Sequence, residues 1–253
     1  MRIVSLTCSN TEIVCALDCA DLLVGVDSDS DYPAEVVAKL PRVGRDLDIE
    51  IDKVKALKPD LVLASLTVPG HERVVTNLER AGLPYLAPEP CSLEDVFADI
   101  RLIGKHLGVA ERAEQLIGDA KAELVPITHR TRPRVLLQWW PKPVIAPGSM
   151  SWAHDLLELC GAENVLADEA IKSRPMDDTE VATLNPDLVV MSWCGVKAEK
   201  YRAEVVLENP AFANVGAVRN QRVYPVPEAH LGRPSLRLLD GYRDLKKLIR
   251  SVV

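Results

Sequence analysis

Apolar and polar positions along the chain alternate between two patterns, short apolar runs and stretches with helical spacing. Runs such as residues 2–6 and 23–26 have the length of buried strands, and each is followed by apolar residues spaced as on one face of a helix. One pattern occurs twice: Leu-x-Pro-Asp-Leu-Val stands at 57–62 and again at 184–189. Proline cannot continue a helix, so each copy reads as a helix end, a break and a buried strand. The repeat predicts one α/β unit used twice.

The remaining pattern predicts alternating strands and helices with a parallel sheet in each half of the chain. Ser9, Asn10 and Thr11 are candidate caps of the first helix. The expected strands lie at 2–6, 23–26, 61–64, 83–86, 134–139 and 188–191, and the expected helices at 11–19, 51–57, from 71 and from 152. This is an α/β fold with two lobes that have parallel-type sheets.

The segment between the two halves is predicted to be helical. Ser92 and Asp95 form an opening similar to a capping box, and apolar residues then recur at helical spacing as far as Leu124. Gly108 marks a kink or a junction of two helices. We therefore expect an N-terminal lobe at 1–91, a connecting helix at 92–130 that forms a long helical spine, and a C-terminal lobe at 131–253. A ligand cleft is expected between the lobes.

Composition excludes several classes of protein. The 253 residues are 47% hydrophobic and carry a formal charge of −7, with a pI near 5.3. That balance argues against broad nucleic-acid binding, which needs a basic face. No apolar stretch approaches the ~20 residues of a membrane-spanning helix. No signal peptide precedes the first strand, so the sequence predicts a cytoplasmic location as given, or a periplasmic one if an export signal was removed.

The six cysteines show no pairing scheme. Cys15 and Cys19 are four apart on the first predicted helix and are expected to be small buried hydrophobic residues. No CxxC pair is present, which argues against a structural zinc site. This usage fits a reducing compartment better than an oxidising one.

Five groups of residues in this chain match the sequence of a known family. They lie at 2–6 with 10–12, 30–33, 57–62, 155–164 and 233–235. These segments resemble class III periplasmic binding proteins, the substrate-binding proteins that deliver cobalamin and iron-siderophores to ABC importers. The resemblance covers essentially the whole chain and is strongest to the cobalamin-binding branch. It implies a fold of two α/β lobes bridged by one long helix.

The resemblance and the aromatic residues together predict a solute-binding protein that holds a corrinoid or related metal chelate. Large flat side chains at strand-end loops suit a flat macrocycle. The alternative for each tryptophan is ordinary packing within a lobe. The candidate ligand-binding residues are Cys8, Asp29, Tyr32, Trp139, Trp140, Trp193 and His230.

An axial ligand to cobalt or iron is a separate question. His71, His154 and His230 fall near predicted strand-end loops, and Cys8 or Cys194 are the thiol candidates. The alternating Asp27, Asp29 and Asp31 are not a calcium loop, because Tyr32 and Ala38 stand where Gly and Glu are required. No metal site built by protein residues alone is predicted.

In the family, a glutamate on each lobe meets basic pockets of the importer's permease. The resemblance places the first at Glu72 and the second near Gly232, which has no charge; Glu228 is close but shifted. We therefore expect one-sided and weak docking to an ABC importer permease, or no docking.

Two alternative functions remain open from the sequence. Within the same class, the ligand is an iron-siderophore or heme in place of cobalamin. In another class, a cytoplasmic chelatase-like enzyme would use His71-Glu72 or Glu228 with His230. No GxSxG, HExxH or P-loop motif supports an enzyme, and the sequence favours a binding protein. A scaffold role is a third option.

Overall fold

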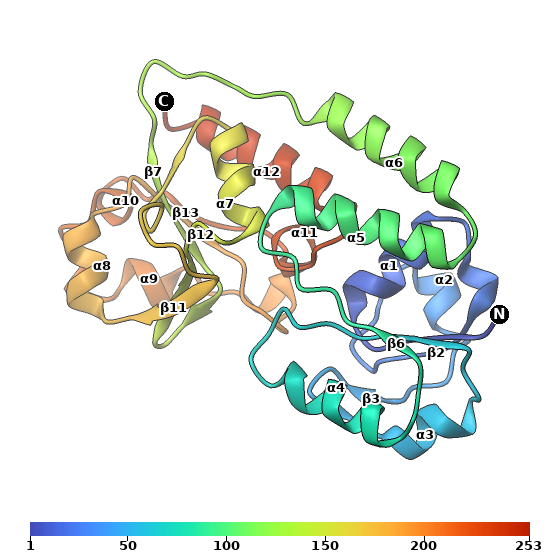
Figure 1. Ribbon diagram of the computed structural model, residues 1–253. Coiled ribbons are helices and arrows are strands. Elements are labelled where there is room, and N and C mark those ends of the chain that lie inside the picture. Colours follow the sequence, from blue (N-terminus) through green and yellow to red (C-terminus); the bar gives the residue numbers. More distant parts are fainter. The chain divides into compact units, whose positions relative to one another are not determined.

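A computed structural model describes all 253 residues and divides them into two compact units. The first unit comprises Met1–Pro90 and Asp95–Asp119, and the second comprises Cys91–Glu94 and Ala120–Val253. Each unit is built around its own four-stranded sheet, and each is described by itself (Figure 1).

The first unit alternates strands and helices along the chain. Its elements are β1 (Ile3–Ser5), α1 (Cys8–Ala16), η1 (Ala20–Leu22), β2 (Leu23–Val26), α2 (Ala34–Val37), β3 (Gly44–Arg45), β4 (Asp48–Ile49), α3 (Ile51–Ala56), β5 (Leu61–Leu63), α4 (His71–Arg80), β6 (Tyr85–Leu86) and most of α5 (Leu93–His106) and α6 (Ala110–Glu123).

The second unit has the same alternation with an additional antiparallel sheet. Its elements are β7 (Arg134–Gln138), β8 (Trp140–Pro141), β9 (Val144–Pro147), α7 (Trp152–Leu159), β10 (Glu163–Asn164), β11 (Ser173–Met176), α8 (Asp178–Leu184), β12 (Leu188–Met191), η2 (Ala198–Lys200), α9 (Glu204–Leu207), η3 (Pro210–Phe212), α10 (Gly216–Arg219), β13 (Val223–Pro225), α11 (Glu228–Leu231) and α12 (Leu238–Arg250).

Both main sheets have the same topology. The strand order is β2-β1-β5-β6 in the first unit and β10-β7-β12-β13 in the second, and all neighbouring strands are parallel. In each sheet the first strand lies between the second and the third. The repeated strands, β5 and β12, therefore occupy equivalent places in separate sheets, which confirms the predicted α/β fold with two sheet-bearing units.

The helices of the first unit lie on both faces of its sheet (Figure 1). Val54 of α3, Val74 and Leu78 of α4 share one core cluster with Val4 of β1 and Val62 of β5. The apolar side chains of a parallel strand point to both faces, and both need cover. This explains why the strands read as continuous apolar runs in the sequence.

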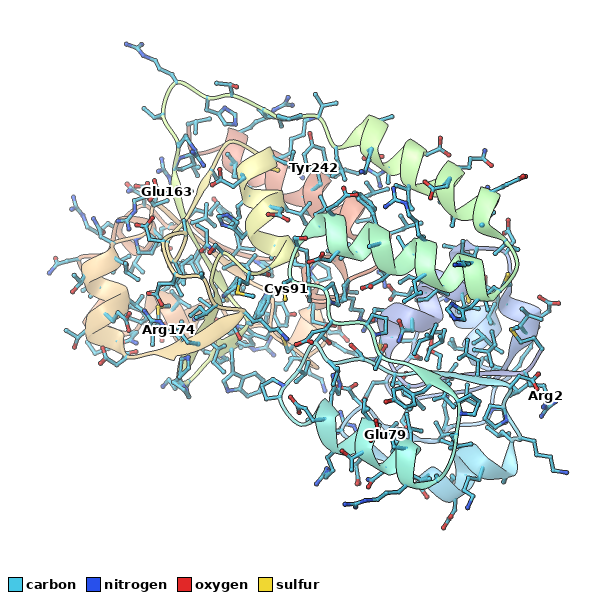
Figure 2. The ribbon with its side chains drawn as sticks, viewed as in Figure 1. Arg2, Glu79, Cys91, Glu163, Arg174 and Tyr242 are labelled. Atoms are coloured by element: carbon cyan, nitrogen blue, oxygen red, sulfur yellow. The ribbon has the colours of Figure 1, made fainter.

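The repeated pattern performs the same structural task in each unit. In the first, Lys58 follows the end of α3 with a left-handed backbone (φ 47°), and the Asp60 carboxylate accepts the backbone N–H of Arg2 at 2.7 Å. The Arg2 guanidinium, labelled in Figure 2, donates to the carbonyl of Leu57 at 2.7 Å. The helix end is thus tied to the start of β1.

The second unit reproduces these contacts one by one. Asn185 ends α8 with φ 47°, and the Asp187 carboxylate accepts the backbone N–H of Arg134 at 2.9 Å. The Arg134 guanidinium donates to the Leu184 carbonyl. Shared contacts of this kind explain why Pro-Asp-Leu-Val was kept in both copies as a unit.

The segment between the two sheets is helical, as the sequence predicts. α5 and α6 are separated by a short break that contains Gly108 with φ 75°, a conformation that favours glycine. Gly108 therefore marks a junction of two helices. Helical structure ends at Glu123, and residues 124–130 form no helix or strand.

Two local predictions at the first helix are wrong. The cap is Thr7, whose hydroxyl accepts the N–H of Asn10, so the helix begins before Ser9. The helix ends at Ala16 and Asp18 has φ 58°, so Cys15 and Cys19 do not share a helix face. None of the six cysteines forms a disulfide.

The comparison of Lys58 with Asn185 yields a stability prediction. A left-handed backbone is unfavourable for lysine and is adopted more readily by asparagine. We expect Lys58→Asn to raise the free energy of unfolding by about 0.5 kcal/mol in urea denaturation. The control is Lys55→Asn, inside α3, which should be slightly destabilising. Equal effects of both variants would contradict the argument.

Candidate functional site

The carboxyl ends of the central strands are where a ligand is expected in this topology. Chain connections run in opposite directions from the two middle strands of each sheet, and ligands of open α/β sheets bind at that switch point. The middle strands are β1 and β5 in the first unit, and β7 and β12 in the second. Cys8, Trp139 and Trp193 all lie in the segments that follow these strands.

In the first unit, polar side chains fix the segments at this point. The amide group of Asn10 donates to the carbonyl of Ala64, beyond β5, at 2.7 Å. The hydroxyls of Ser65 and Thr67 lie 3.0 Å apart. Cys8 is half-buried at the start of α1. The segments that follow β1 and β5 are therefore joined by the side chain of Asn10.

The loop after β2 is organised by a buried carboxylate. Asp27 is fully buried and accepts the backbone N–H groups of Asp29 at 2.8 Å and Ser30 at 3.1 Å, together with the hydroxyl of Ser30. Burial raises the pKa of the Asp27 carboxyl above its usual range, although the Ser30 hydroxyl opposes the shift. The folded protein binds this proton more tightly than the unfolded chain does. The free energy of unfolding therefore falls as the pH rises from the ordinary pKa of aspartate through the raised pKa of Asp27.

The loop then presents Asp29 and Tyr32. Asp29 is paired with Arg45 through two hydrogen bonds of 3.1 and 3.2 Å. Tyr32 is 49% exposed. The sequence identified Asp29 and Tyr32 but not Arg45, because nothing in its spacing links it to a loop 16 residues earlier.

His71 has a structural role at the start of α4. Its Nδ1 accepts the N–H of Val68 at 3.2 Å, so Nε2 carries the proton and donates to Asp46 at 2.9 Å. The ring is 3% exposed. Both nitrogens are therefore engaged, which removes His71 from the candidate axial ligands.

In the second unit, two tryptophans follow β7. The ring of Trp139 lies 6.3 Å from that of Trp152, with the planes at 30°. Trp152 opens α7 and donates from Nε1 to the carbonyl of Leu231 at 2.7 Å. Trp140 is the residue of β8 that pairs with Ile145, and it is 40% exposed. Trp140 is thus the most exposed of the candidate tryptophans.

Trp193 is packed into the core of the second unit. It is 6% exposed, its ring lies 5.1 Å from that of Tyr201, and its Nε1 donates to the side-chain carbonyl of Gln138 at 2.9 Å. Gln138 is itself buried, at the end of β7. Most of the Trp193 ring is therefore packed within the second unit, which is the alternative to ligand binding considered for each tryptophan.

Two buried polar atoms lie at the ends of β7 and β12 without hydrogen-bond partners, Nε1 of Trp139 and Oγ of Ser192. Met191 pairs with Gln138, so Ser192 and Trp139 are the next positions in register and share a face of the sheet. Unpartnered buried donors are costly, and they are uncommon away from functional sites.

The remaining histidine candidates differ in their surroundings. Nδ1 of His230 lies 2.8 Å from the Asp244 carboxylate, an arrangement that orients a ring and fixes its tautomer. Nδ1 of His154 is buried without a partner. No three His, Cys, Asp or Glu side chains gather in a metal-binding group. At most two such side chains could therefore reach one metal ion.

The two docking positions also differ. Glu72 is exposed in the first turn of α4 and accepts the N–H of Gly70 at 2.9 Å. Glu228 forms a largely buried ion pair with Arg233 at 3.1 Å. The Glu228 carboxylate is therefore already paired within the second unit, and the neighbouring Gly232 carries no charge.

None of the helices combines the length and apolar character needed to span a bilayer. The chain resembles known proteins over nearly its whole length. The family model described as "Periplasmic binding protein" matches residues 3–229.

Three relatives illustrate the range of this similarity. An uncharacterised ABC transporter substrate-binding lipoprotein of Bacillus subtilis is 32% identical over 98% of this chain and 79% of its own. The periplasmic vitamin B12-binding protein of Vibrio cholerae is 25% identical with a TM-score of 0.77, covering 99% of this chain and 97% of its own. The periplasmic heme-binding protein of Roseiflexus is 25% identical with a TM-score of 0.82, covering 99% and 98%.

The first relative is described as a substrate-binding protein of an ABC transporter and the other two as periplasmic binding proteins, so the family match supports a binding protein and not the chelatase alternative. The shared sheet topology, the repeated Pro-Asp contacts and the family match lead to one conclusion. The chain belongs to the family of periplasmic binding proteins.

Proposed function

We propose that this solute-binding protein takes a metal chelate as its ligand, a corrinoid such as cobalamin first, with heme or an iron-siderophore as the alternative. The observation that carries the proposal is the presence of aromatic residues beyond the strand ends of each unit. Tyr32 follows β2, Trp139 and Trp140 follow β7, and Trp193 follows β12.

These rings differ in their exposed fraction, and we assign them different roles in ligand binding. Tyr32 and Trp140 are 49% and 40% exposed and would stack directly on a flat ligand. Trp139 packs on Trp152, and Trp193 packs on Tyr201. Both would therefore contribute to the contact surface mainly by holding it in place through packing. Cys8, Asp29 and His230 complete the proposed set of ligand-binding residues.

The choice between cobalamin and heme turns on the polar groups at the same strand ends. A corrinoid carries several amide side chains, whereas a heme carries two propionates. In the second unit, Trp139 and Ser192 offer hydrogen-bond donors without protein acceptors, which suits either ligand. Arg45 is already neutralised by Asp29, so the first unit offers no unpaired guanidinium there for a propionate. This favours the corrinoid.

The relatives favour a site of action outside the cytoplasmic membrane. The Bacillus subtilis relative is described as a lipoprotein, and the Vibrio cholerae and Roseiflexus proteins as periplasmic. We therefore prefer the periplasmic alternative to the cytoplasmic one, with an ABC importer permease as partner.

The docking proposal predicts an asymmetric effect of two substitutions. Glu72 sits at the favourable end of the α4 dipole and accepts the N–H of Gly70, so Glu72→Ala should lower the free energy of unfolding by only about 0.3–1 kcal/mol and reduce transport by a reconstituted importer. The parent should stimulate transport weakly, since Gly232 supplies no charge. Gly232→Glu should raise stimulation.

A Cβ at position 232 would approach the Glu228 side chain to 3.0 Å, so Gly232→Gln serves as the control for packing strain. Strong stimulation by the parent that is indifferent to Glu72 would contradict the docking proposal.

The ligand proposal is tested by titrating the purified protein with cobalamin, heme and a ferric siderophore, using intrinsic tryptophan fluorescence and isothermal calorimetry. Saturable one-to-one binding of one of them supports the proposal. No binding of any of the three overturns it.

A further inference from the structure

The loop after β2 is held from both sides by charged groups that no ligand contact explains. Residues 27–32 carry Asp29 and Tyr32, which the proposed function assigns to the ligand. The sequence offers no regular structure here, and a polar loop of this length is mobile unless it is tied down. Two side chains, Asp27 and Arg42, supply those ties.

The Asp27 side chain holds the loop by accepting hydrogen bonds from the backbone N–H groups of the loop. Its carboxylate accepts the backbone N–H of Asp29 and of Ser30, and the Ser30 hydroxyl donates to it as well. The side chain is fully buried. A buried carboxylate that accepts several hydrogen bonds in fixed geometry strongly restricts the backbone that supplies them.

The Arg42 guanidinium holds the same loop by donating hydrogen bonds to the backbone carbonyls of the loop. One guanidinium nitrogen donates to the carbonyls of Asp27 at 2.9 Å and Ser30 at 2.7 Å. The other donates to the carbonyl of Val37, at the end of α2, at 3.0 Å. The planar guanidinium can hold these three acceptors at once, which a lysine ammonium cannot do in the same geometry.

The Ser30 hydroxyl extends this arrangement to the switch point of the sheet. It lies 2.9 Å from the hydroxyl of Thr11 in α1, and the Thr11 hydroxyl donates to that of Ser5 in β1 at 2.8 Å. All of these side chains are buried. The loop is therefore connected to α1 and β1, next to Cys8.

We propose that Asp27 and Arg42 are positioning residues that hold the 27–32 loop in its ligand-binding conformation, so that Tyr32 meets the ligand without an ordering cost. This inference rests on the proposed function. A preorganised loop binds more tightly because the entropy of ordering it was lost on folding and not on binding. Tyr32 lies in the sequence between Ser30 and Val37, whose carbonyls both accept hydrogen bonds from Arg42. Its backbone is therefore held on both sides, so Tyr32 is the residue whose ordering cost is lowered.

The test compares three substitutions in the full-length protein. Asp27→Ala removes the acceptor for both amides, and Arg42→Lys retains the charge but loses the planar fork. Asp27→Asn keeps one acceptor oxygen for the amides and turns its amide group towards Ser30, whose hydroxyl can donate to Thr11 instead. Val54→Ala, on the buried face of α3, is the matched control for a general loss of stability.

We expect Asp27→Ala and Arg42→Lys to weaken binding of the ligand found by titration by about tenfold or more, mainly through a faster dissociation rate. Asp27→Asn should restore affinity to within about threefold of the parent, and Val54→Ala should leave it unchanged despite a lower melting temperature. Affinity that follows melting temperature across all four variants would overturn the proposal.

Hydrogen exchange of the Asp29 and Ser30 amides gives a readout that needs no ligand. Protection of both amides should fall in Asp27→Ala and persist in Asp27→Asn and Val54→Ala. Unchanged protection in Asp27→Ala would overturn the role of Asp27 even if the protein binds its ligand. Lost protection in a protein that binds none of the three chelates would instead contradict only the proposed function.

Discussion

Replacing Trp193 with alanine should lower the free energy of unfolding by about 3–5 kcal/mol, the range measured when large aromatic side chains are removed from cores. The ring is 6% exposed and packs on Tyr201 within the core cluster of the second unit. Its removal leaves a cavity and also leaves the buried side-chain carbonyl of Gln138 without its donor. Urea denaturation followed by circular dichroism measures the loss.

Trp193→Phe separates the two contributions. Phenylalanine fills most of the volume but cannot donate to Gln138, so about 1–3 kcal/mol of the loss should remain. Trp193→Phe combined with Gln138→Leu should recover part of that, because both polar partners are then gone. A stability change below about 1 kcal/mol in Trp193→Ala would show that the ring is not part of the core.

Removal of the exposed rings should act mainly on affinity. Tyr32→Ala and Trp140→Ala are each expected to weaken ligand binding by about 10- to 100-fold, or ~1–3 kcal/mol, as aromatic truncation at binding surfaces does. Both side chains are about half exposed, so the free energy of unfolding should fall by less than it does in Trp193→Ala. Calorimetric titration with the bound chelate measures the effect.

Conservative variants distinguish stacking from other contacts at these positions. Tyr32→Phe and Trp140→Phe keep a flat ring and should retain most of the affinity if stacking is the main interaction. Val125→Ala is the control for an exposed apolar side chain in the second unit away from the strand ends, and it should have no effect. Unchanged affinity in both alanine variants would remove Tyr32 and Trp140 from the proposed site.

The sequence predicted the two α/β units because the repeated pattern encodes contacts within each unit. The apolar run and the proline act on their own strand and helix, and the aspartate ties that helix end to the start of the first strand of the same unit. The left-handed backbone at Lys58 and Asn185 was not predicted, because a residue before proline favours an extended conformation.

The antiparallel sheet β11-β9-β8 was not predicted. Its strands are short and rich in proline, with Pro141, Pro147 and Pro175 among their residues. Proline lacks the N–H that a sheet ladder uses and argues against a strand when only the sequence is considered. The pairing of β9 with β11 connects segments far apart in the chain, which local pattern does not reveal.

The chemistry of the site was predicted only in part for the same reason. Strand-end tryptophans are visible in the sequence because each follows an apolar run. Their partners Gln138, Tyr201 and Trp152, and the pairing of Arg45 with Asp29, depend on tertiary contacts. His71 shows the converse: its position beside a strand-end loop suggested a ligand, whereas its two hydrogen bonds give it a structural role.

The most direct test of the central claim is to identify what the protein carries when purified from its native host, by visible absorption spectroscopy and mass spectrometry under non-denaturing conditions. We predict a single equivalent of a corrinoid, with heme or a ferric siderophore as the alternative, and loss of that species from a Tyr32→Ala, Trp140→Ala double variant that remains folded. A bound solute that is neither planar nor a metal chelate, retained equally by the double variant, would contradict the account.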